Sequence, residues 1–172
     1  LCVGSVTPTK GQDLLVEALA RVTAHPWTCD LVGPLGRAPA HVADVCAAIA
    51  RHGLDGRVRM PGPLVGAPLA AAFGAADLLV LPSRAEAYGM VVTEALARGI
   101  PVLAADVGGV RSALGGTGLL VPPDDVAALA GALRRWFGRA DLRAELRAGA
   151  LARRGELTGW EVTSRCLVAI LD

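Results

Sequence analysis

Residues 78–107 read LLVLPSRAEAYGMVVTEALARGIPVLAADV, and this stretch decides the fold. Its first four residues form an apolar run, which gives way at Pro82 to a short polar turn. Apolar residues then recur at helical spacing over residues 88–98, the pattern stops at Gly99, and a second apolar run follows at residues 101–104. The order strand, loop, helix, strand predicts one crossover unit of a parallel sheet.

The same alternation of apolar runs and helical patterns continues through the rest of the chain. Because the runs do not alternate with polar residues, the strands should be buried on both faces, as in a parallel sheet covered by helices on each side. The sequence therefore predicts an α/β fold with about six parallel strands. Besides the stretch above, the expected strands are residues 1–5, 29–33, 58–60 and 118–121, and the expected helices are residues 14–22, 40–52, 66–74, 110–114, 126–137, 141–154 and 160–171.

Length and composition indicate one globular domain. The chain has 172 residues, of which 53% are hydrophobic and 19% are charged, a balance that excludes a disordered chain. The net charge of +1 gives no field that would attract nucleic acid or an anionic membrane, so neither is expected as a partner. No apolar run approaches the roughly 20 residues that span a bilayer. The first residues lack the features of a signal peptide and read as a chain that begins inside a strand.

The cysteines and histidines show no spacing that indicates a metal site. The cysteines lie far apart without a C-x-x-C pair, so we expect neither zinc nor a disulfide, but buried free thiols in a reducing compartment, the cytoplasm. The histidines fall on expected helices or their ends without a partner in the sequence, and we expect them on the surface. These residues are Cys2, Cys29, Cys46, Cys166, His25, His41 and His52.

The loops that follow the expected strands are the place where a ligand should bind. In open parallel α/β sheets, ligands bind beyond the carboxyl ends of the strands, where the chain leaves for the helices. Each of these loops contains Gly or Pro, and two of them carry the unusual charges of the chain. They are residues 5–11, 33–39, 61–63, 82–89 and 106–110.

The helix that follows Gly89 offers a site for an anion. The amides from Gly89 to Val92 should lie unpaired at the helix start, where free N–H groups and the helix dipole both favour negative charge. Lys10, the single lysine of the chain, follows another strand and could add its charge to the same site. A lysine before a helix also fits an ordinary surface position, and the sequence leaves both interpretations open.

Two carboxylates, Glu86 and Glu94, lie in this otherwise apolar neighbourhood. Glu86 could accept hydrogen bonds from ligand hydroxyls, or it could cap the helix, which the dipole would favour by about 0.3–1 kcal/mol. Glu94 lies within an apolar stretch of the helix, where an unpaired buried charge is costly. It should therefore point into water or meet a hydroxyl or an arginine. The residues alone do not decide between these roles.

Several familiar motifs are absent. The first turn, GSVTPTKG at residues 4–11, is neither the dinucleotide-binding G-x-G-x-x-G nor a Walker A loop. No G-x-S-x-G elbow indicates a Ser/His/Asp hydrolase. A flavodoxin-like receiver would need clustered aspartates at the end of the first strand, and the chain has none there.

Residues 82–102, PSRAEAYGMVVTEALARGIPV, resemble the E-x7-E signature of the retaining glycosyltransferases of family 4. The segment at residues 4–20 is similar to the pattern G-x-x-x-x-x-K-G-x-D-x-L-x-x-A-x of that family. The resemblance covers the whole chain. Its further matches are Val32-Gly33, residues 58–62, Gly108-Gly109, residues 118–123 and Trp160.

The resemblance implies a GT-B fold, in which two Rossmann-like domains face each other across a cleft. Residues 1–172 would be the C-terminal, donor-binding half, a Rossmann-like three-layer sandwich, and the N-terminal, acceptor-binding half would lie outside this chain. The implied reaction transfers a sugar from a nucleotide diphosphate donor to an acceptor sugar, lipid or small molecule, with retention at the anomeric carbon and without a metal or other cofactor. Any peripheral contact with a membrane would come through the missing half, and the donor-binding half alone would be inactive.

The resemblance also implies roles for individual residues. Lys10 would bind the donor diphosphate, Glu86 would contact hydroxyls of the transferred sugar, and Glu94 would hold the ribose hydroxyls. Amides near Gly89 would meet the phosphates or the sugar, and the turn at Met60 would lie against the base. The implied catalytic residues are Glu86 and Lys10, and the implied donor-binding residues are Ser5, Lys10, Met60, Arg84, Glu86, Tyr88, Gly89, Met90, Val91 and Glu94.

The chain departs from the family pattern at three places. Ser5 stands where many members have an arginine that binds phosphate, Tyr88 stands where Phe is commoner, and Arg111-Ser112 replaces a frequent Pro-Glu. Arg84 or Arg111 could compensate for the arginine that is lost at Ser5. Two other functions stay open, namely a nucleotide-binding module without catalysis and a GT-B-type nucleotide-sugar epimerase, although an epimerase would need further acid and base residues in these loops.

Overall fold

The computed structural model describes residues 1–157, which form six β-strands, seven α-helices and one short 3₁₀ helix. The helix expected at residues 160–171, the match at Trp160 and Cys166 lie outside the described residues. Within residues 1–157, no helix is both long and apolar enough to cross a membrane. The elements are β1 (Cys2–Val3), η1 (Pro8–Lys10), α1 (Gln12–Ala20), β2 (Cys29–Val32), α2 (Pro39–Arg51), β3 (Val58–Gly62), α3 (Ala67–Gly74), β4 (Leu79–Leu81), α4 (Met90–Leu96), β5 (Val102–Ala105), α5 (Val110–Leu114), β6 (Leu119–Val121), α6 (Val126–Gly138) and α7 (Ala140–Glu156).

The strands form two parallel three-stranded sheets, β1-β2-β3 and β4-β5-β6, which meet edge to edge. At the junction of β1 and β4, the Leu1 nitrogen donates to the Leu78 carbonyl oxygen at 3.0 Å, and the Val80 amide donates to the Leu1 carbonyl oxygen at 2.9 Å. The spatial order is therefore 3-2-1-4-5-6, and the prediction of about six parallel strands is confirmed. In this order the winding reverses between β1 and β4, and ligands bind at that point beyond the carboxyl ends of the strands.

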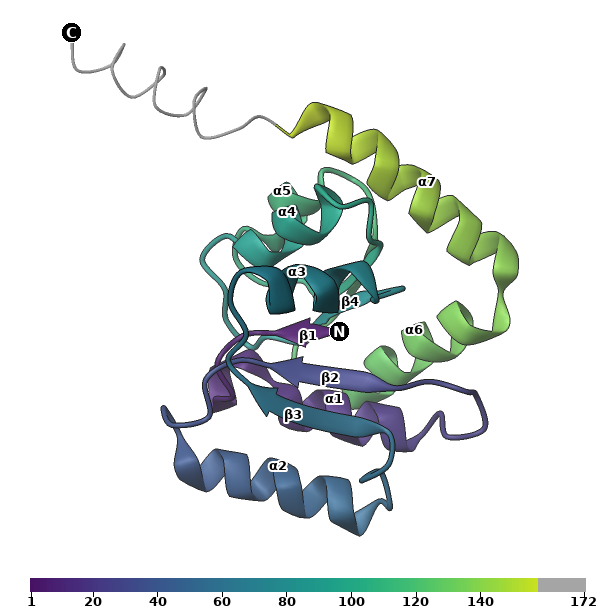
Figure 1. Cartoon of the computed structure of the whole chain (residues 1–172). Coiled ribbons are helices and arrows are strands. Elements are labelled where there is room, and N and C mark those ends of the chain that lie inside the picture. Colours follow the sequence, from purple (N-terminus) through teal and green to yellow (C-terminus); the bar gives the residue numbers. More distant parts are fainter. Residues whose placement is uncertain (158–172) are drawn as a thin grey trace, which may run out of the picture.

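Helices cover both faces of the sheet and give three layers (Figure 1). Helices α1, α2 and α6 bury one apolar cluster against one face, and α3, α4 and α5 bury a second cluster against the other. Strand β4 serves both clusters, because Val80 joins the first while Leu79 and Leu81 join the second. Helix α7 links the two layers, since Leu146 packs in the first cluster and Ala150 in the second. The predicted α/β, Rossmann-like three-layer sandwich is confirmed.

Several elements differ from their expected bounds by a few residues, and the differences at β3 and α4 have identifiable local causes. Strand β3 continues beyond Met60 through Pro61, where the sequence suggested that it would end. Proline lacks the N–H that residues of a central strand donate to a neighbouring strand. Because β3 is an edge strand with a neighbour on one side only, proline is tolerated there. Helix α4 is shorter than the expected residues 88–98, because Gly89, with φ of +85°, begins it in a left-handed conformation.

The prediction of free thiols is confirmed at Cys2, Cys29 and Cys46, but the prediction that they are buried holds for Cys2 and Cys29 and is wrong at Cys46. Burial raises the pKa of the Cys2 thiol to about 12, and the neighbouring Cys29 adds to the rise. Cys46 is exposed because it follows Val45, which faces the core, and the next helical position turns about 100° away from the core. Within residues 1–157, no group of three or more His, Cys, Asp or Glu side chains could hold a metal ion.

The three histidines, expected at the surface, are half-buried, and two of them have acidic partners that the sequence did not indicate. His41 Nε2 lies 3.6 Å from Asp13 Oδ1, and His52 Nε2 lies 3.1 Å from Glu17 Oε2. Both histidines are partly buried because α1 and α2 pack side by side, a contact that spacing along the chain does not show. His25 stacks on the ring of Phe137 with 5.4 Å between ring centroids.

Candidate functional site

The loops that follow β1 and β4 lie in backbone contact at the junction of the two sheets. The Arg84 amide donates to the Thr9 carbonyl oxygen at 2.8 Å. Gly11 has φ of +68°, and a Cβ atom at this position would lie 2.2 Å from the Pro82 carbonyl oxygen. Only glycine combines this conformation with so close an approach. The fold thus joins the two charged loops at the point where sheets of this order bind ligands.

Lys10 and Glu86 meet in this junction. Lys10 ends η1, and its Nζ lies 2.6 Å from Glu86 Oε2. The hydroxyl of the fully buried Ser83 donates to the same oxygen at 3.3 Å. Because the Lys10 side chain is 29% exposed and that of Glu86 is 14% exposed, a ligand can reach both charges. Within residues 1–157, Glu86 accepts hydrogen bonds from Lys10 and Ser83 and none from the amides at the start of α4, which does not support the alternative in which it caps that helix.

The start of α4 lies against Glu86 and presents free amides. A Cβ atom on Gly89 would lie 3.7 Å from Glu86 Cγ. Within residues 1–157, the amides of Met90 and Val91 donate no hydrogen bond, as expected for a helix start. The Val92 amide donates to the Gly89 carbonyl oxygen at 2.8 Å, so the prediction of an unpaired amide at Val92 is wrong. The Gly89 amide likewise donates no hydrogen bond within residues 1–157, so three free N–H groups remain to favour an anion beside the Lys10–Glu86 pair.

The loop after β5 supports Glu86 from behind. Gly108 has φ of +50°, and a Cβ atom there would lie 1.7 Å from the Glu86 carbonyl oxygen. The Gly109 amide donates to the Ala87 carbonyl oxygen at 3.0 Å. The backbone that carries Glu86 is therefore held between the loop after β1 and the loop after β5, so the position of its Cα atom is fixed.

The other predicted site residues lie outside this ion pair, and none hydrogen-bonds to it within the described part of the chain. Ser5 is half-buried in the first loop, and Met60 packs on β3 against the first apolar cluster. Glu94 is exposed on α4, which favours the alternative in which it points into water. Tyr88 is 47% exposed and Met90 is 55% exposed, so both offer apolar surface beside the free amides.

The two arginines that could compensate for Ser5 are both engaged with carboxylates. Arg84 pairs with Asp13 and with Asp124, each at 2.6 Å, and Arg111 pairs with Asp106. Hydrogen bonds to Asp13 raise the pKa of the Arg84 guanidinium, with a further contribution from Asp124. Burial raises the pKa of Asp13, but the hydrogen bonds and charge of Arg84 outweigh it and hold that pKa below its usual value.

Gln12 is a buried polar residue that sequence reasoning missed. Its side chain is almost fully buried, and Nε2 donates to the Ser5 carbonyl oxygen at 3.1 Å and to that of Gly4 at 3.4 Å. A glutamine at the start of a helix usually lies in water, so the sequence contained no signal for this role. Gln12 fixes the backbone of the first loop from the protein interior.

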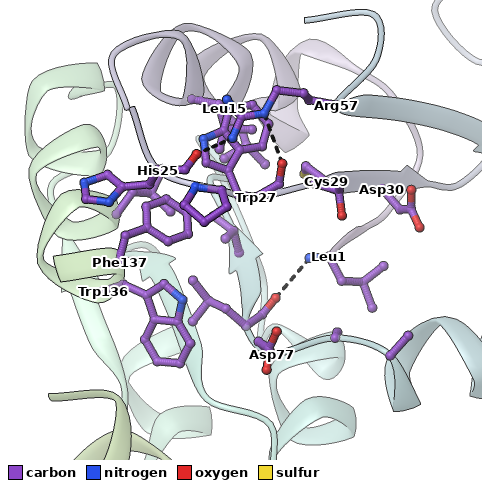
Figure 2. A pocket seen from close by; sticks show the side chains of 18 of the residues that line it. Leu1, Leu15, His25, Trp27, Cys29, Asp30, Arg57, Asp77, Trp136 and Phe137 are labelled. Atoms are coloured by element: carbon purple, nitrogen blue, oxygen red, sulfur yellow. Dashed lines mark hydrogen bonds between the residues drawn. The ribbon is translucent and has the colours of Figure 1, made fainter. Parts of the chain in front are cut away.

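A large pocket lies at the amino ends of the strands, on the side of the sheet opposite to the Lys10–Glu86 junction, and Figure 2 shows the residues that line it. It encloses about 1080 Å³, and its walls include Leu1, Cys29 and Leu78, which stand where β1, β2 and β4 begin. Arg57 lies over the Trp27 ring at 3.7 Å and donates to the Trp27 carbonyl oxygen, so this cation is already satisfied. Since parallel sheets bind ligands at the carboxyl ends of their strands, we assign the candidate site to the Lys10–Glu86 junction.

Comparison with known proteins identifies relatives of this chain. The family model "Glycosyl transferases group 1" matches residues 1–139. The chain is 37% identical to a D-inositol 3-phosphate glycosyltransferase of Jonesia denitrificans, over 98% of this chain and 41% of the relative. It is 39% identical to the protein of the same name from Geodermatophilus obscurus, over 98% of this chain and 39% of the relative. The chain thus spans about two fifths of the length of these curated relatives.

Solved structures share the fold. Anabaena Alr3699/HepE in complex with UDP superposes with a TM-score of 0.84 and 29% identity, over 99% of this chain and 48% of the other. The sucrose-phosphate synthase of Thermosynechococcus elongatus superposes with a TM-score of 0.85 and 30% identity, over 99% of this chain and 44% of the other. A family model that covers most of the chain, together with relatives of this identity, shows that the chain belongs to the group 1 glycosyl transferases.

Proposed function

We propose that this chain is the donor-binding domain of a retaining glycosyltransferase of family 4 and that it binds a nucleotide diphosphate sugar. In the complete protein, a further domain would bind the acceptor. The observation that carries the proposal is the pairing of Lys10 with Glu86 beside the free amides of α4, at the point where the winding of the sheet reverses. The solved complexes of Alr3699/HepE with UDP and with UDP-glucose support it from a relative of the same fold.

The proposed chemistry uses fixed positive charge in place of a metal. Lys10 and the amides of Met90 and Val91 would neutralise the diphosphate as it leaves, which is the task that a metal ion performs at many other phosphate sites. Glu86 would accept hydrogen bonds from hydroxyls of the sugar, Glu94 would hold the ribose, and the acceptor would attack from the side of the leaving group, so that the configuration is retained. No protein nucleophile takes part in this scheme.

The proposal is tested by isothermal titration of the chain with UDP, GDP and ADP, followed by the matching sugar nucleotides. We expect one nucleoside diphosphate to bind, and we expect the matching sugar nucleotide to bind at the same site in competition with it. A chain that keeps its circular dichroism spectrum and binds none of these compounds would count against the proposed function.

Replacing Glu86 with glutamine should tighten the binding of the free nucleoside diphosphate by about threefold to tenfold. The carboxylate lies 2.6 Å from the Lys10 ammonium, and it both occupies that cation and repels an incoming phosphate. Glutamine removes the charge at nearly constant volume. The same variant should lose affinity for the sugar nucleotide relative to the diphosphate, and titration of both ligands measures that ratio. Weaker binding of both ligands would contradict the assigned role.

Replacing Glu94 with alanine should act in the opposite direction. If Glu94 holds the ribose hydroxyls, the variant loses the hydrogen bonds between these hydroxyls and the Glu94 carboxylate. The affinities for the diphosphate and for the sugar nucleotide should then fall equally, by about tenfold. Titration of the two ligands against this variant checks the expectation. Glu94→Gln is the matched control, because it keeps one acceptor and should lose less. An unchanged affinity in Glu94→Ala would remove Glu94 from the site.

A further inference from the structure

We infer that Arg84 is a positioning residue, which holds the turn of Lys10 beside Glu86 and does not itself contact the phosphates of the donor. The inference rests on the proposed function, since it concerns how the donor site is built. It assigns to Arg84 a different task from that of a substitute phosphate ligand.

The Arg84 guanidinium has almost no donor left for a ligand. Its Nε donates to Asp124 Oδ1 at 2.6 Å, and Nη2 donates to Asp13 Oδ2 at 2.6 Å. Nη1 donates to Asp13 Oδ1 at 2.9 Å and to the Pro8 carbonyl oxygen at 2.5 Å. A guanidinium has five N–H groups, and four of them are used here. A phosphate oxygen would have to displace two carboxylates to gain a bidentate contact.

The charge around Arg84 also disfavours an anion. One guanidinium lies between the two carboxylates of Asp13 and Asp124, so these three groups together are negative. An approaching diphosphate would be repelled by the carboxylates that already neutralise Arg84. At the Lys10–Glu86 pair, by contrast, the charges balance and the free amides of α4 add positive potential.

The partners of Arg84 show what it positions. Pro8 is the first residue of η1 and Lys10 is the last, so the bond to the Pro8 carbonyl holds the turn that carries the lysine. The Arg84 amide binds the same turn through the Thr9 carbonyl. Asp13 fixes the guanidinium from the first turn of α1, and Asp124 fixes it from the turn before α6. Arg84 therefore ties three loops at the carboxyl edge of the sheet into one rigid frame.

A double-mutant cycle separates positioning from direct binding. The affinity for UDP, or for whichever nucleoside diphosphate the chain binds, is measured for the wild type, Lys10→Ala, Arg84→Ala and the double variant, with titrations carried into the millimolar range. A positioning residue acts through Lys10. Arg84→Ala should therefore weaken the affinity by about threefold to tenfold in the wild-type background and should weaken it no further in the Lys10→Ala background. If Arg84 instead contacted the phosphates directly, its replacement would weaken the affinity by the same factor in both backgrounds. That additive result would overturn the inference.

Acylation of the ligand-free chain gives a second readout that direct phosphate binding would not move. Lys10 is the single lysine, so mass spectrometry of its peptide reports the reaction rate of one side chain with an amine-reactive ester. Arg84→Ala should raise this rate because the turn loosens, while Arg59→Ala, which breaks an exposed pair between Arg59 on β3 and Asp30 on β2, should not. An unchanged rate in Arg84→Ala would overturn the inference.

If Arg84→Ala does not fold, Asp124→Gly takes its place in both measurements. Asp124 has φ of +56°, so glycine relieves the backbone while removing one carboxylate that holds the guanidinium. The same outcomes then decide the question. No binding of any nucleoside diphosphate by the folded wild type would overturn the proposed function and this inference with it, whereas binding with an additive cycle would overturn the inference alone.

Discussion

Replacing Lys10 with alanine should weaken nucleoside diphosphate binding by about 10- to 100-fold, the largest loss that we expect from one side chain. Within the described residues Lys10 pairs with Glu86 alone, so no second carboxylate competes for its charge. Its removal deletes a charge-assisted contact to phosphate. It also leaves the Glu86 carboxylate unpaired and facing the incoming anion, which adds repulsion to the lost attraction.

The double variant Lys10→Ala/Glu86→Gln is the matched control for this loss. If part of the loss comes from the orphaned carboxylate, neutralising Glu86 should restore part of the affinity. Arg59→Ala removes a cation from an exposed ion pair on the same sheet and should leave the affinity unchanged. Isothermal titration measures all three variants. Equal affinities of Lys10→Ala and the wild type would show that the diphosphate does not bind at this junction.

Replacing Gly11 with alanine should lower the free energy of unfolding by about 2–5 kcal/mol. The φ of +68° costs a residue with a Cβ atom about 1–2 kcal/mol. The Cβ atom would also lie 2.2 Å from the Pro82 carbonyl oxygen, and relief of that overlap must push apart the two loops that carry Lys10 and Glu86. Urea unfolding measures the stability, and we expect nucleotide binding to weaken in the same variant.

Gly53→Ala isolates the backbone part of this effect. Gly53 has φ of +63°, but no atom lies within 4 Å of a Cβ at that position. It should therefore lose only the conformational term of about 1–2 kcal/mol and keep its affinity for the nucleotide. Equal losses of stability in the two variants would mean that the contact between Gly11 and Pro82 does not hold the loops together.

The architecture was predictable because buried strands and helices leave different periods in the sequence. The apolar runs at residues 78–81 and 101–104 lie on β4 and β5, and the helical pattern between them lies on α4. Expecting the site in the loops after the strands followed from general properties of parallel sheets. The strand order could not be predicted, because the contact between Leu1 and Val80 depends on which edges of the two sheets meet.

The contacts within the site could not be predicted from the sequence either, because they join residues that lie far apart along the chain. Arg84 pairs with acids 71 and 40 residues away, and nothing in the spacing along the chain marks Asp13 or Asp124 as its partners. Arg84 therefore read as a free cation that could bind phosphate. The pairing of Glu86 with Lys10, 76 residues away, was likewise not marked by any spacing along the chain.

The protection of Lys10 by a bound nucleotide tests the central proposal most directly. The chain is treated with an amine-reactive ester alone, with a saturating nucleoside diphosphate that titration has shown to bind, and with the matching nucleoside, and the Lys10 peptide is quantified by mass spectrometry. If the diphosphate binds at Lys10, we expect the diphosphate to slow the acylation of this residue by about tenfold or more and the nucleoside, which has no phosphates, to leave it unchanged. Equal acylation of Lys10 with and without the bound diphosphate would contradict the assignment of the donor site to the Lys10–Glu86 junction.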